Sequence, residues 1–168
     1  MDEVHFQQHG SRCRMWVPPE VDDPICLHAP TRKSISFFGA VRLKDGKLVM
    51  SRPKGMFDAV TCWDFFRKLA RHRRPGRQMV VIIDNARYHH AALHEPWRQQ
   101  VANHFRLHFL PPYSPELNPI ERVWKLTRRR CLHNRYFPTL DEVVDAVDPV
   151  FQAWSRPNTT LHRLCGIL

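Results

Sequence analysis

The stretch "MVVIID" (residues 79–84) indicates the fold class of this chain. Its five apolar residues are mostly β-branched and run without interruption, which is typical of a central strand buried on both faces. Asp84 follows directly at the carboxyl end of this strand. In open α/β sheets, functional side chains gather at the carboxyl ends of strands, so Asp84 is a candidate site residue. For an isolated aspartate in this position, an Asx turn or a helix cap is the more common explanation.

The stretch "LPPYSPELNPIERVW" (residues 110–124) carries a second candidate acid, Glu121. Prolines restrict the backbone of the loop, and a helix is expected to start at its end. Asn118 fits an N-cap, Pro119 the first helical position and Glu121 the acid of a capping box. If the rigid loop also brings Glu121 beside Asp84, two carboxylates meet at one rim of the sheet, which is unfavourable unless a cation lies between them. Such hard oxygen ligands suit Mg²⁺ or Mn²⁺.

The rest of the chain predicts an α/β sandwich with a mixed sheet. "SISFFGAVRL" (residues 34–43), an Asp-Gly turn and "LVM" predict a β-hairpin. "CRMWVPP" (residues 13–19) and "RLHFL" (residues 106–110) predict two more strands. Apolar periodicity predicts helices within residues 56–76, 88–105, 118–131 and 139–154, the last capped by Thr139. All the tryptophans are expected in the core or in helix packing: Trp16, Trp63, Trp97, Trp124 and Trp154.

The amino-acid composition limits the classes of protein to which this chain can belong. Lys and Arg number 26 against 16 Asp and Glu, giving a net charge of +10. This surplus favours nucleic acid as a partner, although a solvated basic face without a partner has the same composition. The five scattered cysteines contain no CxxC pair, which argues against a disulfide framework or a cysteine zinc site and suits a reducing cytoplasm. No apolar run approaches membrane-spanning length and the N-terminus lacks a signal-peptide pattern, so we expect a soluble protein.

Two motifs together resemble a known family. "VVIIDNARYHH" (residues 80–90) and "LPPYSPELNPIERVWKLTRR" (residues 110–129) are similar to the catalytic domain of DDE-type transposases, in the mariner-related group of bacterial insertion sequences. The resemblance implies a ribonuclease H-like fold, with a central mixed β-sheet flanked by helices and carrying three acids. By this resemblance the second acid is Asp84 and the third is Glu121.

The segment "DEVHFQQHGSRCRMWVPP" (residues 2–19) resembles the surroundings of the first acid, which places that acid at Asp2. The first strand is expected to be truncated, because this acid normally follows a strand and only Met1 precedes Asp2. Family members usually carry an N-terminal helix-turn-helix region, and none is found here. Residues 1–168 are therefore expected to form a single catalytic domain.

The resemblance also implies the reaction. Asp2, Asp84 and Glu121 would hold two Mg²⁺ ions, with Mn²⁺ as a substitute, for DNA cleavage and strand transfer during transposon movement. The implied partner is double-stranded DNA, both transposon ends and target, bound by a homodimer in the bacterial cytoplasm and nucleoid, with an upstream transposase fragment as a further partner. The alternative is a catalytically inactive truncated fragment that binds DNA or a partner polypeptide through its basic surfaces.

Two further groups of residues are candidates around the acids. Basic residues expected to contact the DNA backbone are Arg87, Lys125, Arg128, Arg129 and Arg130. For any single one of these, ordinary solvated charge is an equally good explanation. Residues expected to assist the site, for example by orienting water or a phosphate, are Asn85, His89, His90 and Asn118.

Overall fold

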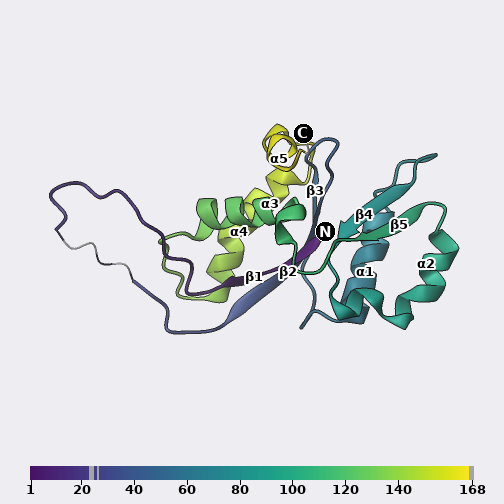
Figure 1. Cartoon of the computed structure of the whole chain (residues 1–168). Coiled ribbons are helices and arrows are strands. Elements are labelled where there is room, and N and C mark those ends of the chain that lie inside the picture. Colours follow the sequence, from purple (N-terminus) through teal and green to yellow (C-terminus); the bar gives the residue numbers. More distant parts are fainter. Residues whose placement is uncertain (23–24, 26, 167–168) are drawn as a thin grey trace.

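The computed structural model describes residues 1–22, 25 and 27–166 and has an α/β architecture (Figure 1). The strands are β1 (Asp2–Gln7), β2 (Ser34–Val41), β3 (Leu48–Ser51), β4 (Met79–Ile83) and β5 (Phe105–Phe109). β1, β2 and β3 form an antiparallel sheet in that order, and β4 pairs with β5 in parallel. The amino group of Met1 donates to the Ile82 carbonyl at 2.7 Å, so the start of β1 lies against β4 and joins the two sheets.

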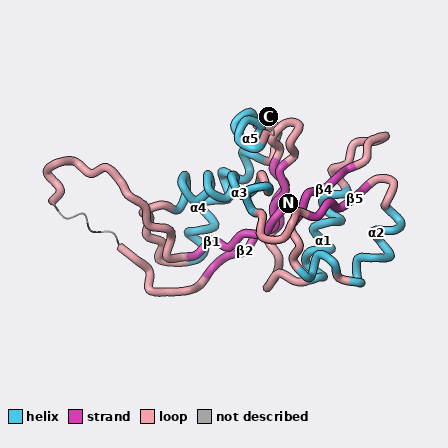
Figure 2. Tube along the Cα trace, in the orientation of Figure 1, coloured by secondary structure: helices cyan, strands magenta, loops and turns pink. Residues whose placement is uncertain are grey.

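Helices connect and cover these strands (Figure 2). They are α1 (Ala59–Ala70), α2 (Glu95–Val101), α3 (Ile120–Thr127), α4 (Leu140–Trp154) and α5 (Thr159–Cys165). Short 3₁₀ turns span Arg87–His90, Ala92–His94 and Pro115–Leu117, and a π-helical turn, Arg128–Leu132, continues α3.

The apolar alternation of the strands produces two cores, one on each face of the β1–β3 sheet. On one face, Phe6 and Phe37 pack with Phe151 of α4, the Phe37 and Phe151 ring centroids lying 5.4 Å apart. On the other face, Phe38 stacks on Phe65 of α1 at 5.4 Å. Successive residues of a strand point to opposite faces, so β2 serves both cores. Helices on both faces of the β1–β3 sheet and a parallel β4–β5 pair beside it confirm the predicted α/β class with a mixed arrangement of strands.

The elements predicted from strong local signals are present. The hairpin turns at Asp45-Gly46, where Gly46 has a φ of 70° and a Cβ atom would lie 2.1 Å from the Asn158 carbonyl oxygen. A side chain at this position would therefore be both strained and blocked. Thr139 caps α4 as expected, its hydroxyl accepting from the Glu142 N–H at 3.3 Å.

Several predictions of elements are wrong. Residues 13–19 form no strand, and the long loop between β1 and β2 extends away from the body of the protein, with Trp16 fully exposed (Figure 1). The start of the helix predicted within residues 88–105 is instead two 3₁₀ turns, Arg87–His90 and Ala92–His94, so that α2 begins only at Glu95. α5 was not predicted. β4 is not buried on both faces, because Val80 is 55% exposed.

The position of Asp2 also differs from the expectation. Asp2 is the first residue of β1, which continues to Gln7 and pairs with β2 along its whole length. Val4 and Phe6 are buried on the face that Asp2 shares, and this apolar alternation holds the strand in place. The acid thus begins a strand instead of following one.

Two findings concern the wider chain. Among the described residues, no helix combines the length and apolar character needed to cross a bilayer. Cys13, Cys62, Cys131 and Cys165 are free thiols, and Cys26 lies outside the described residues.

Candidate active site

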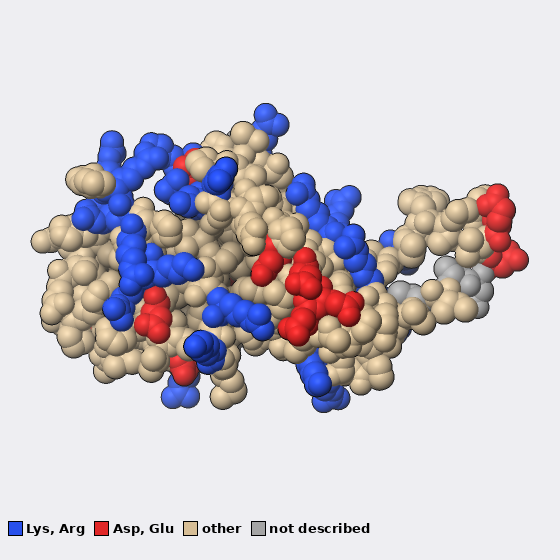
Figure 3. All heavy atoms as spheres, turned by 180° about the vertical axis from the view of Figure 1, so that it is seen from behind, with Lys and Arg blue, Asp and Glu red and all other residues tan. Residues whose placement is uncertain are grey.

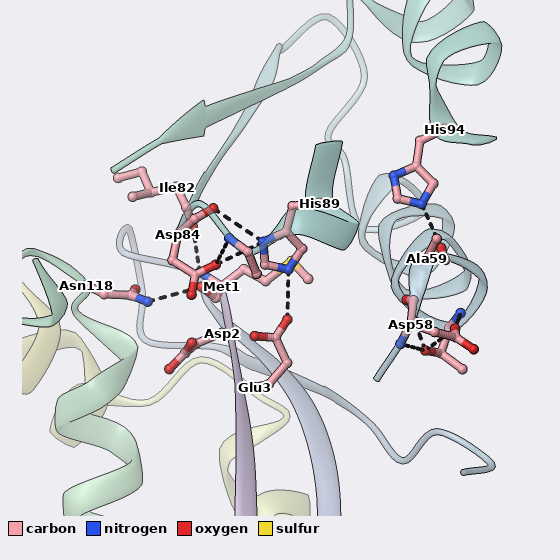
Figure 4. Close-up of polar contacts among 12 residues, drawn as sticks. Met1, Asp2, Glu3, Asp58, Ala59, Ile82, Asp84, His89, His94 and Asn118 are labelled. Carbon is pink, nitrogen blue, oxygen red and sulfur yellow. Dashed lines mark hydrogen bonds and ion pairs between the residues drawn. The ribbon is translucent and has the colours of Figure 1, made fainter. Parts of the chain in front are cut away.

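Two adjacent acids at the start of β1 enter different environments because strand residues alternate between faces (Figure 4). Asp2 is 8% exposed and accepts a hydrogen bond at 2.9 Å from the indole Nε1 of Trp124 in α3. Glu3 lies on the other side, where its Oε1 is 2.9 Å from Nε2 of His89. One strand therefore supplies a carboxylate to each face of the sheet.

Gly39 permits the contact between Trp124 and Asp2. It pairs with Asp2 across β1 and β2, and a Cβ atom at this position would lie 2.2 Å from the Trp124 ring carbon Cη2. No side chain fits in that space, so the indole ring can cross β2 only over a glycine. Gly39 was not among the predicted site residues. A glycine inside an otherwise apolar and β-branched strand is the signal that could have indicated this close approach.

Asp84 follows β4 and is held by two kinds of contact. Its Oδ1 accepts from the Ala86 N–H at 3.1 Å, which is the Asx turn expected of a strand-end aspartate. The same atom lies 2.9 Å from Nδ1 of His89. The Asp84 side chain nevertheless stays 48% exposed. It therefore forms the Asx turn and is still accessible at the rim of the sheet.

His89 bridges the two acids from a fully buried position. Burial alone would lower the pKa of its imidazole, but hydrogen bonds with Asp84, Cys62 and Glu3 raise that pKa to about 11. This raised pKa favours the imidazolium form, in which each ring nitrogen donates to one of the two carboxylates. In turn, the hydrogen bond from His89 lowers the pKa of Asp84.

The pKa of Asp2 is shifted in the opposite direction to the pKa of Asp84. Burial, followed by repulsion from Glu3, raises its pKa to about 7, and Glu121 adds to the rise, while the hydrogen bond from Trp124 opposes it. The Met1 amino group interacts electrostatically with Asp2, Glu3 and Asp84, and burial lowers its pKa to about 6. Asp2 is thus influenced by the carboxylates of Glu3 and Glu121, and the Met1 amino group interacts with Asp84 as well.

The predicted capping box at α3 is wrong. Pro119 is the N-cap and no side chain caps the helix, while the Asn118 amide donates to the Met1 carbonyl at 3.2 Å. Asn118 is buried against β1, and this long-range contact replaces the local one. Within the described part of the chain, the Glu121 carboxylate makes no hydrogen bond or ion pair, so capping does not explain it.

Ligand chemistry at this site suits a divalent cation. One ligand atom each from Glu3, Asp84 and His89 lie within 4.8 Å of one another. The raised pKa of His89 disfavours its imidazole as a ligand, because a metal ligand must be deprotonated, so the two carboxylates are the better ligands. Mutual repulsion among acids and the buried Asn118 Oδ1, which has no partner among the described residues, both fit a site for a hard cation.

The candidate basic residues lie close by along the chain. Arg87 is exposed in the turn between Asp84 and His89, and Lys125 and Arg129 are exposed on α3 and its π-helical continuation. The guanidinium of Arg128 lies 5.6 Å from the centroid of Phe6, and that of Arg130 lies 5.6 Å from that of Trp154. These two arginines therefore also pack on the protein.

The remaining auxiliary candidates support the loop after β4. The Asn85 amide donates to the Leu110 carbonyl, and its Oδ1 is 3.2 Å from Nε2 of His90. His90 stacks on Phe109 with centroids 4.1 Å apart. Asn85 and His90 thus tie this loop to β5. Figure 3 shows Lys and Arg spread over much of one face of the molecule, beside a smaller group of acidic side chains.

Comparison with known sequences gives a family match. Residues 1–144 match a family model described as DDE superfamily endonuclease. The uncharacterized protein y4pE/y4sA of Sinorhizobium fredii is 34% identical over 110 residues, a match that covers 64% of this chain and 75% of that protein.

Solved structures give the same fold. The Mos1 transposase paired-end complex with left transposon end has a TM-score of 0.71 at 18% identity, covering 98% of this chain and 49% of that chain. The Mos1 mariner paired end complex with Mn gives 0.70 at 18%, covering 98% and 50%, and the complex with Mg gives 0.62 at 19%, covering 96% and 51%. This likeness confirms the ribonuclease H-like fold. The chain spans about half the length of these Mos1 chains.

Proposed function

Because this chain belongs to the DDE superfamily endonucleases, a family of enzymes, we propose that it is a transposase catalytic domain that cleaves DNA and transfers strands. We assign catalysis and metal binding to Asp2, Asp84 and Glu121, and one domain to residues 1–168. The observation that carries this proposal is the electrostatic one: Asp2 is buried near Glu3 and Glu121, and its pKa rises to about 7. Burying acids close to one another is electrostatically unfavourable, and such arrangements are typical of functional sites.

The chemistry of the attacked group explains why acids are needed. A DNA phosphodiester is already anionic and gains charge in the transition state of attack. When bound, divalent cations neutralise that charge and lower the pKa of an attacking water. We propose Mg²⁺, with Mn²⁺ as a substitute and two ions per site. Hard carboxylate oxygens and a free Asn118 Oδ1 support this choice.

Around these acids, the chain's own residues hold the geometry. Trp124 fixes Asp2 by its indole N–H, and His89 fixes both Glu3 and Asp84. In the proposed reaction, water attacks a phosphodiester at the transposon end and releases a 3'-hydroxyl. That hydroxyl then attacks a target phosphodiester, and a target 3'-hydroxyl leaves.

The partners follow as part of the proposal. The Mos1 structures are described as paired-end and strand transfer complexes. By analogy we propose that double-stranded DNA, both transposon ends and target, is bound by a homodimer in the bacterial cytoplasm and nucleoid, with an upstream transposase fragment as an added partner. The basic residues proposed to hold the DNA backbone are Arg87, Lys125, Arg128, Arg129 and Arg130.

A nicking assay tests the proposal. Supercoiled plasmid is incubated with Mn²⁺ or Mg²⁺ and with wild type, Asp84→Asn, Glu121→Gln or the control Asp145→Asn, which changes an exposed acid of α4. The first two variants should lose at least about 100-fold in nicking rate, the scale expected for loss of a transition-state stabilising group. The control should match wild type. Equal nicking by all four proteins contradicts the proposal.

A second candidate function is DNA binding without cleavage, because the net charge of +10 supports DNA binding whether or not the acids act in catalysis. This candidate predicts salt-dependent binding of a labelled duplex in the presence of a chelator and no nicking by any variant with metal. The same assay therefore separates the two functions.

A further inference from the structure

A pocket with a volume of about 650 Å³ lies at the carboxyl end of β1, where the long loop to β2 begins (Figure 1). The last residues of β1, the first residues of this loop and the π-helical turn after α3 line it together. Gln7, which lines the pocket, is about 16 Å from Asp2 at roughly 3.3 Å per strand residue. The pocket is therefore separate from the site around Asp2, Asp84 and Glu121.

Backbone contacts fix the wall of this pocket. Ser11 forms an isolated parallel bridge with His133, and its carbonyl accepts from the Asn134 N–H at 2.9 Å. Just before it, the buried Gln8 donates from its amide to the Phe137 carbonyl at 3.0 Å. The start of the loop is thus held against the segment that follows the π-helical turn, although the loop extends away from the body farther along.

Two arginines line the pocket from different segments, Arg12 from the loop and Arg128 from the π-helical turn. Among the described residues, neither guanidinium forms an ion pair with a carboxylate, and no acid lines the pocket. The guanidinium carbon of Arg128 lies 5.6 Å from the centroid of the Phe6 ring, a contact that holds this side chain in place. Two cations without counter-charges around one hollow attract an anion.

Uncharged hydrogen-bond donors accompany these arginines. Ser11 lines the pocket, and its buried Oγ has no hydrogen-bond partner among the described residues. Turning this hydroxyl toward an acceptor in the pocket therefore breaks no contact within the protein. His9 and His28 also line the pocket, with ring centroids 5.3 Å apart. His28 is exposed, so the pocket is open at the surface, and each imidazole can offer an N–H to a ligand.

This set of donors suits a phosphate group. A planar guanidinium binds phosphate oxygens through two parallel hydrogen bonds, and hydroxyl and imidazole donors can bind the oxygens that remain. The volume lies within the range of small-molecule pockets and leaves room for an organic group attached to the phosphate. Phe6 and Leu132 supply apolar contacts for such a group.

We propose that this pocket binds a phosphate group, held by Arg12 and Arg128 with donors from Ser11, His9 and His28. Its source is either a phosphodiester of the DNA backbone or a small free phosphate, and the recognition chemistry is the same for both. The pocket contains none of the acids assigned to catalysis, so its affinity for phosphate does not depend on DNA cleavage.

Inorganic phosphate tests the pocket directly. Millimolar phosphate should raise the melting temperature of the wild type above that in chloride of equal ionic strength, because a ligand that binds only the folded state stabilises it. A chelator is present, so that no metal bridges phosphate to the acids. Arg12→Ala should bind phosphate at least about tenfold more weakly. The control Arg14→Ala, which removes an exposed arginine outside the pocket lining, should bind phosphate as the wild type does.

Two further measurements locate the binding. Ser11→Ala should weaken phosphate binding and leave the melting temperature without phosphate unchanged, because its hydroxyl has no partner to lose among the described residues. In proton NMR spectra at constant pH, the imidazole signals of His9 and His28 should move when phosphate is added. The signals of His104, which is exposed just before β5, should not move.

A labelled DNA duplex identifies the source of the phosphate. If a backbone phosphodiester occupies the pocket, Arg12→Ala should reduce the slope of log Kd against log salt by about 1, and by more than Arg14→Ala does. If a free phosphate is the ligand, Arg12→Ala keeps the wild-type slope and the duplex does not displace inorganic phosphate. Either result supports the pocket and assigns its ligand. Phosphate binding by a protein that nicks no DNA would support the pocket and contradict only the proposed catalysis.

Two results would overturn the proposal. The first is a melting temperature that phosphate raises no more than chloride does. The second is phosphate binding that is equally tight in the wild type, Arg12→Ala and Arg14→Ala, because the anion then binds elsewhere on the basic surface.

Discussion

At His89 one buried ring contacts two carboxylates through different nitrogens, Asp84 through Nδ1 and Glu3 through Nε2. Two substitutions separate these contacts. Asparagine can place an amide N–H near the position of Nδ1, and glutamine near that of Nε2, while both remove the charge. If Asp84 is the acid that catalysis depends on, His89→Asn should keep about tenfold more nicking activity than His89→Gln. Equal losses would indicate that the positive charge, and not the position of Asp84, is what His89 supplies.

Asp2 links the site to stability through pH. Its folded pKa of about 7 lies above the ordinary aspartate value of 3.8, so between these two pH values the folded protein holds a proton that the unfolded chain releases. The free energy of unfolding should therefore fall as pH rises from about 4 to about 7, measured by urea denaturation with a chelator present. Asp2→Asn should flatten this dependence and stabilise the protein at pH 8.

The melting temperature of the same variant should respond less to metal. Mn²⁺ at millimolar concentration should raise the melting temperature of the wild type, because a ligand that binds only the folded state stabilises it. Asp2→Asn should gain less, and Asp145→Asn, an exposed acid on α4, should gain as much as the wild type. For the pH prediction, the contradicting result is an Asp2→Asn protein whose free energy of unfolding varies with pH as that of the wild type does. It would show that Asp2 is ionised normally in the folded protein.

Among the elements, β2 and α3 are in close contact at Gly39. A methyl group there would overlap the Trp124 ring, and Gly39→Ala should lower the free energy of unfolding by about 1–3 kcal/mol, the usual cost of overpacking. Trp124→Leu opens space at the same point. Urea denaturation of both single variants and the double variant should give a double-variant loss smaller than the sum of the single losses. Strict additivity would mean that the two residues do not press on each other.

Elements with a strong local pattern were predictable. The run of β-branched residues in β4, the Asp-Gly turn at Gly46 and the cap at Thr139 each depend on neighbours within a few positions. The strand predicted for residues 13–19 was wrong because pattern alone does not show whether a pairing partner exists. Val80 was misjudged for a related reason: an apolar strand residue need not be covered by this chain.

The site was predictable only in part. The positions of Asp84 and Glu121 at the end of β4 and the start of α3 agree with the sequence analysis, and their roles stay predictions. Asn118 looked like a helix cap, but it bonds to Met1, a residue 117 positions away. The bridge from Glu3 to His89 spans 86 positions. Local rules cannot foresee contacts of this range, since only the folded sheet brings such residues together.

For the whole molecule, the net charge of +10 predicts DNA binding that weakens as salt increases. Arg129 is exposed, whereas Arg130 also lies over Trp154. Arg129→Ala should reduce the slope of log Kd against log salt by about 1 without changing the melting temperature, as expected for one phosphate contact. Arg130→Ala should reduce both slope and melting temperature, because it also loses a ring contact. An unchanged slope in Arg129→Ala would remove that residue from the DNA interface.

The hydrogen bond between Asp2 and Trp124 joins residues 122 positions apart. During synthesis on the ribosome, β1 leaves the exit tunnel long before α3 has been made, and until then Asp2 has no indole to bind. Contacts of such long range also form late and slowly in folding. A nascent chain therefore carries Asp2 before the indole that fixes it has been made, so any nuclease activity begins only after α3 has left the tunnel.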